Sequence, residues 1–217
     1  MWVVANEPAA GEDGAREYFQ PLVRLTRELD RTRPVCFTNE VRAPPDKDRL
    51  ADLFDVLCLN RYYGWYTFTG DLVSAKDKLE DELRAWQDRF GKPIIMSEYG
   101  VDTLSGLHSV CDTAWSEEDQ VRYLEMYHGV FDRVERVVGE HVWSFADFQT
   151  VSTAWRVDGN KKGVFTRERK PKAAGRYLRE RWTEQGKPAA RKKRLGESEV
   201  ALPEESTTSS VVSAGSE

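Results

Sequence analysis

Two glutamates of this 217-residue chain each follow a short apolar run, which is where parallel α/β enzymes hold their reacting groups. Residues 93–97 lead into Glu98, and residues 1–5 lead into Asn6 and Glu7. Two carboxyl groups can cleave a glycosidic bond, because one protonates the leaving oxygen and the other meets the cationic sugar carbon. If the second attacks directly, the two lie about 5–5.5 Å apart and the sugar keeps its configuration. The pattern predicts Glu7 and Glu98 as a catalytic pair.

Each glutamate also has a purely structural interpretation, in which Glu7 caps a loop and Glu98 pairs with a nearby arginine. The side chains expected around the pair favour catalysis, because sugar rings stack on aromatic rings and tyrosine hydroxyls orient carboxylates. Those side chains are Asn6, Tyr62, Tyr66 and Trp143. Three further aromatic residues at strand ends, Tyr63, Trp65 and Phe145, are expected to pack in the core instead.

A polar loop carries Arg156, Asn160, Lys161 and Lys162, and its cations and amide suit an anionic group such as a sugar carboxylate. Basic loops are also commonly just solvated, so this signal is weak alone. The three histidines show no metal-ligand spacing, and we predict neither a metal nor another cofactor.

Apolar runs and helical stripes alternate about five times along the chain, which indicates a parallel sheet with helical crossovers. A closed barrel needs eight such units. An open doubly wound sheet is the alternative, although no strand is followed by a Gly-rich phosphate loop. Strands are expected at 1–5, 34–39, 56–59, 93–97 and 142–145, and a brief helix at 48–54. Longer helices are expected around Tyr18, Leu22, Leu25 and Leu29, around Leu79 to Phe90, from Ser116 through Val134, and from about Pro171.

The composition sets limits on function and organisation. A net charge of −5 gives no support for a nucleic-acid or membrane partner, and no apolar run approaches the ~18 residues of a membrane span. Cys36, Cys58 and Cys111 are interpreted as reduced core thiols, which favours a cytoplasmic location. We expect a folded domain over 1–182 and a disordered tail over 183–217, whose basic cluster 191–194 is a solvated charge run or a nuclear-localisation signal.

Four motifs give the chain a specific resemblance. Asn6-Glu7-Pro8 and Ser97-Glu98-Tyr99-Gly100 resemble the glycosidases of glycoside hydrolase family 2, which include β-galactosidases and β-mannosidases. The run from Asn60 to Tyr66 and the Asn160-Lys161-Lys162-Gly163 signature narrow the resemblance to the β-glucuronidases of that family. The likeness extends from residue 1 to about Trp182.

This resemblance implies an α/β fold, the last five βα units of a (β/α)8 TIM barrel, and hydrolysis of β-D-glucuronides with retention. It implies Glu7 as a protonated acid/base and Glu98 as an ionised nucleophile that Tyr62 orients. Asn6 would bind the sugar 2-hydroxyl, and Tyr66 and Trp143 would line the sugar pocket. The glucuronate carboxylate would be bound by Asn160 and Lys162, with Arg156 close by. The family commonly forms tetramers.

The chain also departs from the family. Its members carry a jelly-roll-like domain, an immunoglobulin-like domain and three βα units before the Asn-Glu-Pro strand. Because residues 1–5 already resemble a core strand, we expect this chain to be part of a longer parent enzyme. Two alternatives stay open: a non-catalytic half-barrel, and a family-2 glycosidase that acts on a neutral sugar.

Overall fold

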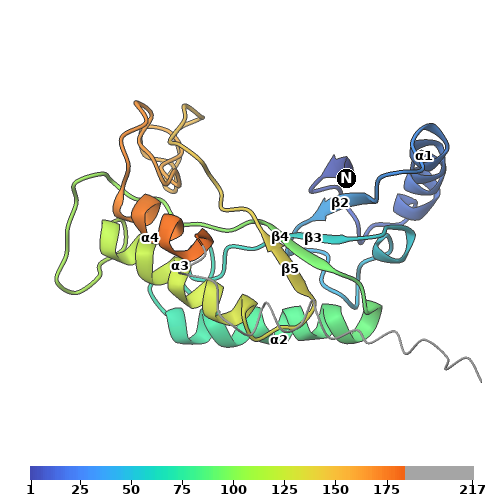
Figure 1. Ribbon diagram of the computed structural model, residues 1–217, viewed down its shortest axis with the longest axis horizontal. Coiled ribbons are helices and arrows are strands. Elements are labelled where there is room, and N and C mark those ends of the chain that lie inside the picture. Colours follow the sequence, from blue (N-terminus) through green and yellow to red (C-terminus); the bar gives the residue numbers. More distant parts are fainter. Residues whose placement is uncertain (184–217) are drawn as a thin grey trace, which may run out of the picture. The chain divides into compact units, whose positions relative to one another are not determined.

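A five-stranded parallel sheet forms the centre of the computed structural model, which describes residues 1–183 (Figure 1). The strands lie in sequence order, each beside its predecessor. A doubly wound sheet would reverse its strand order at a switch point, and no reversal occurs among the described strands. The parallel sheet is therefore confirmed in its singly wound form. The strands are β1 (Trp2–Asn6), β2 (Val35–Asn39), β3 (Leu57–Asn60), β4 (Ile94–Glu98) and β5 (Val137–Glu140).

Helices connect most of the strands, and the ends of two of them follow the expected local signals. The side chain of Asp71 accepts a hydrogen bond from the Ser74 amide at the start of one helix, which ends at Gly91 with a positive φ of 61°. Ser116 caps the next helix by accepting from the Asp119 amide, as its sequence predicts. The helices are α1 (Ala15–Leu29), α2 (Leu72–Phe90), α3 (Glu117–Phe131) and α4 (Ala173–Trp182), with a 3₁₀ turn, η1 (Ala51–Leu53), after β2.

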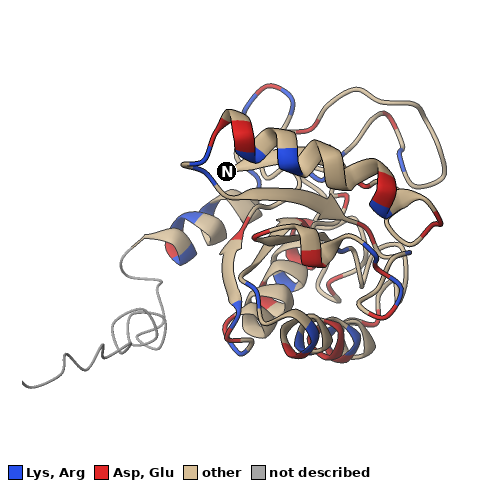
Figure 2. Ribbon diagram, turned by 90° about the vertical axis from the view of Figure 1, so that its right-hand side faces the viewer, with Lys and Arg blue, Asp and Glu red and all other residues tan. Residues whose placement is uncertain are grey.

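The main hydrophobic core lies between the sheet and helices α2 to α4, where α3 packs against both of its neighbours (Figure 1). The predicted stripes of α2 and α3 are buried there, including Leu79, Leu83, Leu124 and Tyr127. A second, smaller core joins α1 to β2. On the exposed helix faces acidic and basic residues alternate (Figure 2), in keeping with the mild net charge.

The predicted last strand at 142–145 is wrong, because β5 lies a few residues earlier, at Val137–Glu140. This strand contains a glycine and a glutamate, so it lacks the apolar run by which we placed strands. Its pairing with β4 carries on irregularly, since the Trp143 amide donates to the Tyr99 carbonyl at 2.9 Å. The chain then leaves the sheet, and the Ser144 amide donates to the Lys162 carbonyl.

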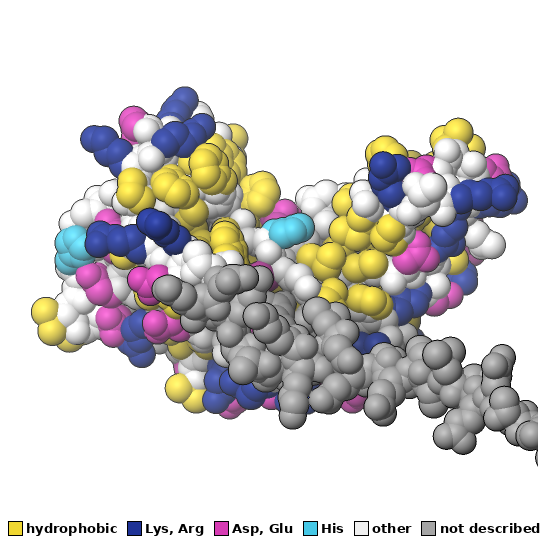
Figure 3. All heavy atoms as spheres, in the orientation of Figure 1, with side chains coloured by type: hydrophobic (Ala, Val, Ile, Leu, Met, Phe, Trp, Pro, Cys, Tyr) yellow, Lys and Arg dark blue, Asp and Glu magenta, His cyan; other side chains and the backbone are white. Residues whose placement is uncertain are grey.

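The first strand and helix are less buried than predicted. The stripe Tyr18, Leu22, Leu25 and Leu29 is exposed, with Leu29 at 79%, and α1 packs through Phe19 and Val23 instead. Trp2 and Val3 of the expected core strand are about half exposed, because β1 pairs only with β2 among the described strands. Hydrophobic side chains accordingly lie on the surface near β1 and α1, and others lie over the loop that follows β5 (Figure 3).

Smaller predictions had mixed outcomes. Cys36 and Cys58 are buried free thiols, whereas Cys111 is exposed and so does not belong to the core. Within residues 1–183 no helix is long and apolar enough to cross a membrane, and no cluster of His, Cys, Asp or Glu is arranged to hold a metal. The predicted disordered tail, with its basic cluster 191–194, lies outside the described residues apart from Thr183.

Candidate active site

The carboxyl ends of the parallel strands bring the two candidate glutamates to one edge of the sheet. β1 ends at Asn6, with Glu7 next in the chain, and β4 ends at Glu98. Asn60, the last residue of β3, is the strand partner of Glu98. Chain segments that are far apart in sequence therefore meet where the sequence analysis placed the chemistry.

Glu7 is held by its backbone and by one amide side chain. Its φ of 49° lies in the left-handed region, and its amide donates to the Thr38 carbonyl at 2.9 Å. Asn60 Nδ2 donates to Glu7 Oε1 at 2.9 Å, while Asn60 Oδ1 accepts from Ser97 Oγ at 2.8 Å. Asn60 thus connects Glu7, the residue after β1, to β4, the strand that carries Glu98.

Asn60 is a site residue that the sequence analysis missed as such. A signal for it was present, because Asn60 ends the apolar run 56–59 just as Glu98 ends 93–97. Asn6 lies in the same network, where its Oδ1 accepts hydrogen bonds from Thr38 Oγ1 and, at 3.4 Å, from Asn60 Nδ2.

Glu98 is partly buried and bonded to a tyrosine. Tyr62 donates its hydroxyl hydrogen to Glu98 Oε2 at 2.6 Å. Burial raises the pKa of Glu98, the Tyr62 hydrogen bond lowers it, and the charge of Glu7 raises it further. Burial and the charge of Glu98 also raise the pKa of Tyr62 far above its usual value, so Tyr62 stays protonated and remains the donor.

A cavity of about 400 Å³ opens over this edge. Glu40 and Val41 after β2 form part of its wall, together with Thr67. Seven of the nine predicted site residues line it: Asn6, Glu7, Tyr62, Tyr66, Glu98, Trp143 and Arg156. Because both glutamates border one space, a single small molecule can contact both.

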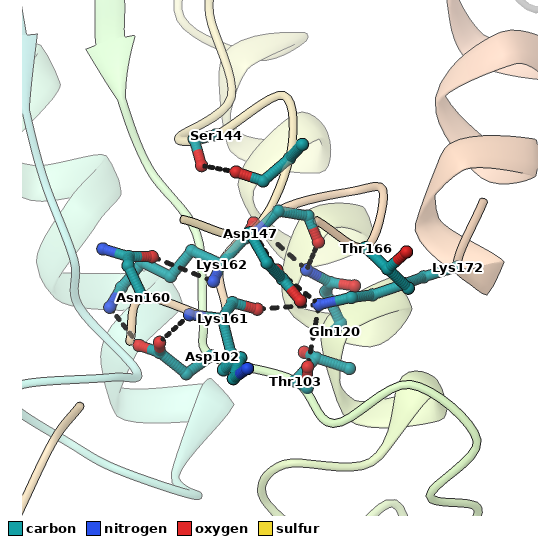
Figure 4. Close-up of polar contacts among 12 residues, drawn as sticks. Asp102, Thr103, Gln120, Ser144, Asp147, Asn160, Lys161, Lys162, Thr166 and Lys172 are labelled. Atoms are coloured by element: carbon teal, nitrogen blue, oxygen red, sulfur yellow. Dashed lines mark hydrogen bonds and ion pairs between the residues drawn. The ribbon is translucent and has the colours of Figure 1, made fainter. Parts of the chain in front are cut away.

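The other two predicted residues, Asn160 and Lys162, are fully buried and, within the part of the chain that the structure describes, do not line this cavity. Lys162 lies directly behind the wall, with Nζ 3.2 Å from the hydroxyl of Tyr66. Arg156 donates to the same hydroxyl at 3.0 Å. The Tyr66 hydroxyl, which belongs to the cavity wall, is therefore bonded to both cations. The Lys162 ammonium forms an ion pair with Asp102, and neither side chain is exposed (Figure 4).

The remaining aromatic residues divide between core and surface. Tyr63 and Trp65 are buried as predicted, and the Lys162 ammonium lies 5.2 Å from the Trp65 ring centre. The prediction that Phe145 packs in the core is wrong, because Phe145 is 63% exposed in the loop after β5. The burial of Lys162 lowers its pKa to about 8, although the charge of Asp102 acts in the opposite direction.

These features define a class of protein. A singly wound parallel α/β sheet with two carboxyl groups on one cavity at its carboxyl edge is the arrangement of barrel enzymes that act on glycosides. The family profile "Glycosyl hydrolases family 2, TIM barrel domain" matches residues 1–185. The chain belongs to this family, and its five strands are barrel strands.

Known relatives point to one branch of the family. The chain is 53% identical to a β-glucuronidase of Streptococcus agalactiae serotype V over 184 residues, which are 84% of this chain and 31% of the relative. It matches the structure of a β-D-glucuronidase of Dictyoglomus thermophilum with TM-score 0.82 and 47% identity, over 85% of this chain and 32% of that one. A Ruminococcus gnavus β-glucuronidase in complex with D-glucuronic acid matches with TM-score 0.79 and 42% identity, over 83% and 33% of the two chains. The chain thus spans about a third of the length of these relatives.

Proposed function

We propose that this chain is the carboxyl-terminal part of a β-glucuronidase that hydrolyses β-D-glucuronides to glucuronic acid and an alcohol with retention of configuration. The observation that carries the proposal is that Glu7 and Glu98 border one cavity beside a hydroxyl that binds two cations. The Ruminococcus relative that binds D-glucuronic acid supports the choice of an acidic sugar.

The proposed reaction has two displacements. In the first, Glu98 attacks the anomeric carbon while Glu7 gives its proton to the glycosidic oxygen, so that the alcohol leaves and a glycosyl–Glu98 ester forms. In the second, Glu7 takes a proton from a water molecule, which attacks the anomeric carbon and releases glucuronic acid and Glu98. Both glutamates return to their starting states.

The hydrogen bonds at the site support this division of roles. The nucleophile must be ionised, and the Tyr62 hydroxyl favours the charged form of Glu98 against the cost of burial. Glu7 is exposed and bonded to Asn60, which leaves it accessible to a leaving group and to water. Asn6, next to Glu7 and on the same cavity, is placed to bind a hydroxyl near the reacting carbon.

Recognition of the sugar acid is assigned to Arg156, Lys162 and Asn160. Arg156 borders the cavity directly, and Lys162 acts from behind Tyr66. The Asn160 amide nitrogen is buried and has no hydrogen-bond partner among the described residues, although its oxygen accepts from the Lys162 amide at 3.0 Å. An unpartnered donor is costly to bury, so a substrate carboxylate that reached it would satisfy it.

Lys162→Met is expected to reduce kcat/KM for 4-nitrophenyl β-D-glucuronide about 10- to 150-fold. This factor corresponds to the free energy of one hydrogen bond to a charged group. The matched β-D-glucoside, which has a hydroxymethyl group in place of the carboxylate, should lose far less. Because the substitution leaves Asp102 buried without its cation, Lys162→Met/Asp102→Asn is measured in parallel. Equal losses on both substrates would remove the assignment of carboxylate recognition.

The charge of Lys162 also predicts a pH dependence. Its pKa of about 8 means that the ammonium loses its proton as the pH rises through that value. We therefore expect KM for the glucuronide to rise above about pH 8, while KM for the glucoside stays level through the same range. Initial rates measured from pH 6 to about pH 10 test this, and parallel curves for the two substrates would contradict it.

The decisive experiment assays the complete product of the gene that encodes this chain. Release of 4-nitrophenol from the β-D-glucuronide, glucoside, galactoside and mannoside separates the proposal from a neutral-sugar glycosidase. Proton NMR of the first product formed should show the β-anomer of glucuronic acid, whereas the α-anomer would indicate inversion. Residues 1–217 alone are assayed beside it, and we expect no turnover because β1, which positions Glu7, pairs only with β2 among the described strands.

A further inference from the structure

Two buried ion pairs hold the segment that carries Asn160 and Lys162 (Figure 4). The lysines of the two pairs differ in their remaining hydrogen-bond partners. In the first, Asp102 pairs with Lys162; in the second, Asp147 pairs with Lys172, the residue just before α4. The pairs meet at Lys161, whose amide donates to Asp102 Oδ1 at 2.6 Å and whose carbonyl accepts from Lys172 Nζ at 2.9 Å.

We propose that Asp102 is a positioning residue that gives the site its selectivity for acidic sugars, by keeping the Lys162 ammonium charged and aimed at Tyr66. This inference rests on the proposed function and assigns a role to a residue that is not among those lining the cavity. Asp102 acts through Lys162, which in turn acts through the Tyr66 hydroxyl.

The geometry around Asp102 fixes both the backbone and the side chain of its partner segment. One carboxylate oxygen accepts from the Lys161 amide, and the other accepts from Lys162 Nζ. An ammonium has three N–H groups, of which Asp102 takes one and Tyr66, at 3.2 Å, takes another. The rings of Tyr66 and Trp65 lie 5.0 and 5.2 Å from Nζ and restrict its position further.

In the second pair, by contrast, the protein takes every N–H group of the lysine. Lys172 Nζ donates to Asp147 Oδ1 at 2.9 Å, to the Thr103 carbonyl at 2.8 Å and to the Lys161 carbonyl at 2.9 Å. All three of its N–H groups are thus used within the protein, and its role is to join chain segments. Asp147 therefore offers a control: it is a buried aspartate that also pairs with a buried lysine, but it binds Lys172 and the Gly163 amide instead of the Lys162 ammonium.

Charge and burial explain why Asp102 matters for selectivity. A buried lysine tends to lose its proton unless an opposite charge lies beside it. Burial already lowers the pKa of Lys162 to about 8, and the charge and hydrogen bond of Asp102 oppose a larger fall. The other groups that face the ammonium are Glu98 at the end of β4, Tyr62 and Tyr66 after β3, and Arg156 in its own loop.

Removing the Asp102 charge should lower the pKa of Lys162 further, because of the charged neighbours that remain, Glu98 favours the ammonium and Arg156 opposes it. The ammonium would then lose its proton at a lower pH. A neutral lysine can no longer attract a carboxylate, whereas a neutral sugar would be bound as before.

The test uses Asp102→Asn in the complete gene product. We expect kcat/KM for the glucuronide to fall about 10- to 100-fold relative to the glucoside at pH 7.5, the range of a lost charge-assisted contact. The alkaline limb of the glucuronide profile should move to lower pH, and Asp102→Glu should restore part of both effects. Unchanged selectivity, or higher selectivity because Asp102 competes with the substrate carboxylate, would overturn the proposal.

Asp147→Asn separates positioning from general loosening of the loop. It should lower the thermal midpoint as Asp102→Asn does, but it should leave the glucuronide-to-glucoside ratio and the alkaline limb unchanged. An equal loss of selectivity in Asp147→Asn would show that any damage to this loop suffices, and would also overturn the proposal.

Failure of the proposed function gives a different result from failure of this inference. If the wild-type protein cleaves no glucuronide, the proposed function fails. Calorimetric titration with D-glucuronic acid and D-glucose then measures the acid preference without turnover. If the wild-type protein binds the acid more tightly and Asp102→Asn reduces this preference, the role of Asp102 is supported. If the wild-type protein shows no such preference, or if Asp102→Asn keeps it, the role is overturned.

Discussion

Glu98→Gln is expected to abolish turnover of 4-nitrophenyl β-D-glucuronide by the complete gene product, with a loss of about 10⁴-fold or more in kcat. The amide has nearly the shape of the carboxylate and can still accept from Tyr62, so the cavity should keep its form. What is lost is the negative charge and, in the proposed mechanism, the nucleophile. The measurement is single-substrate kinetics, with mass spectrometry of the wild-type protein to detect a glycosyl ester on Glu98.

Glu80→Gln is the matched control for this variant. Glu80 is a carboxylate on the outer part of α2, where it pairs with Arg84 and Arg133 at 2.7 Å. Partly exposed ion pairs of this kind contribute little, so both rate and stability should stay near wild type. A Glu98→Gln protein that kept the rate of the Glu80→Gln protein would end the assignment of Glu98 as nucleophile.

The second large effect is expected for stability at Arg61, the residue after β3. Its fully buried guanidinium donates to both oxygens of Glu82 on α2 and to the Asn39 and Asn60 carbonyls. Arg61→Met removes the cation and leaves the buried Glu82 charge without a cationic partner, although Tyr63 and Trp86 still donate hydrogen bonds to it. This should lower the free energy of unfolding by about 3–5 kcal/mol. Urea unfolding followed by tryptophan fluorescence measures it, since Trp86 donates to Glu82 at 3.1 Å.

The double variant Arg61→Met/Glu82→Met tests the cause of this loss. If the damage comes from the unpaired buried carboxylate, removing both charges should recover a large part of the stability. If the double variant loses the sum of the two single losses, the cause is packing and the charge argument is wrong. Arg61→Lys should not substitute, because an ammonium cannot reproduce the forked set of donors.

The sequence carried enough information to predict the elements whose signals are local. The caps at Ser116 and Gly91 and the buried stripes of α2 and α3 follow from the side chains of consecutive turns. The position of Glu98 at the end of β4 was predictable, because the apolar run 93–97 comes directly before it. β5 was not, because Gly139 and Glu140 interrupt its apolar run and it is defined by pairing with β4, a contact distant in sequence.

Roles that depend on tertiary contacts were less visible. Asp102 looks like one acid in a polar loop until the structure pairs it with Lys162, sixty positions away. The stripe on α1 shows the opposite limit, because periodicity tells which face of a helix is apolar but not what covers it. Its residues Tyr18 and Leu29 proved exposed while Phe19 and Val23 carry the packing.

The uneven support of the two glutamates has a consequence for rate. Glu98 ends a strand with hydrogen-bonded neighbours on both sides, whereas Glu7 extends from the outermost described strand, with β2 as its sole flank. Thermal displacement of β1 would shift Glu7, the proposed proton donor, more than Glu98, the proposed nucleophile. In the proposed complete enzyme, a segment that paired with the other side of β1 would hold Glu7 in place relative to Glu98. Substitutions in such a segment should therefore change the rate, although they lie far from the sugar.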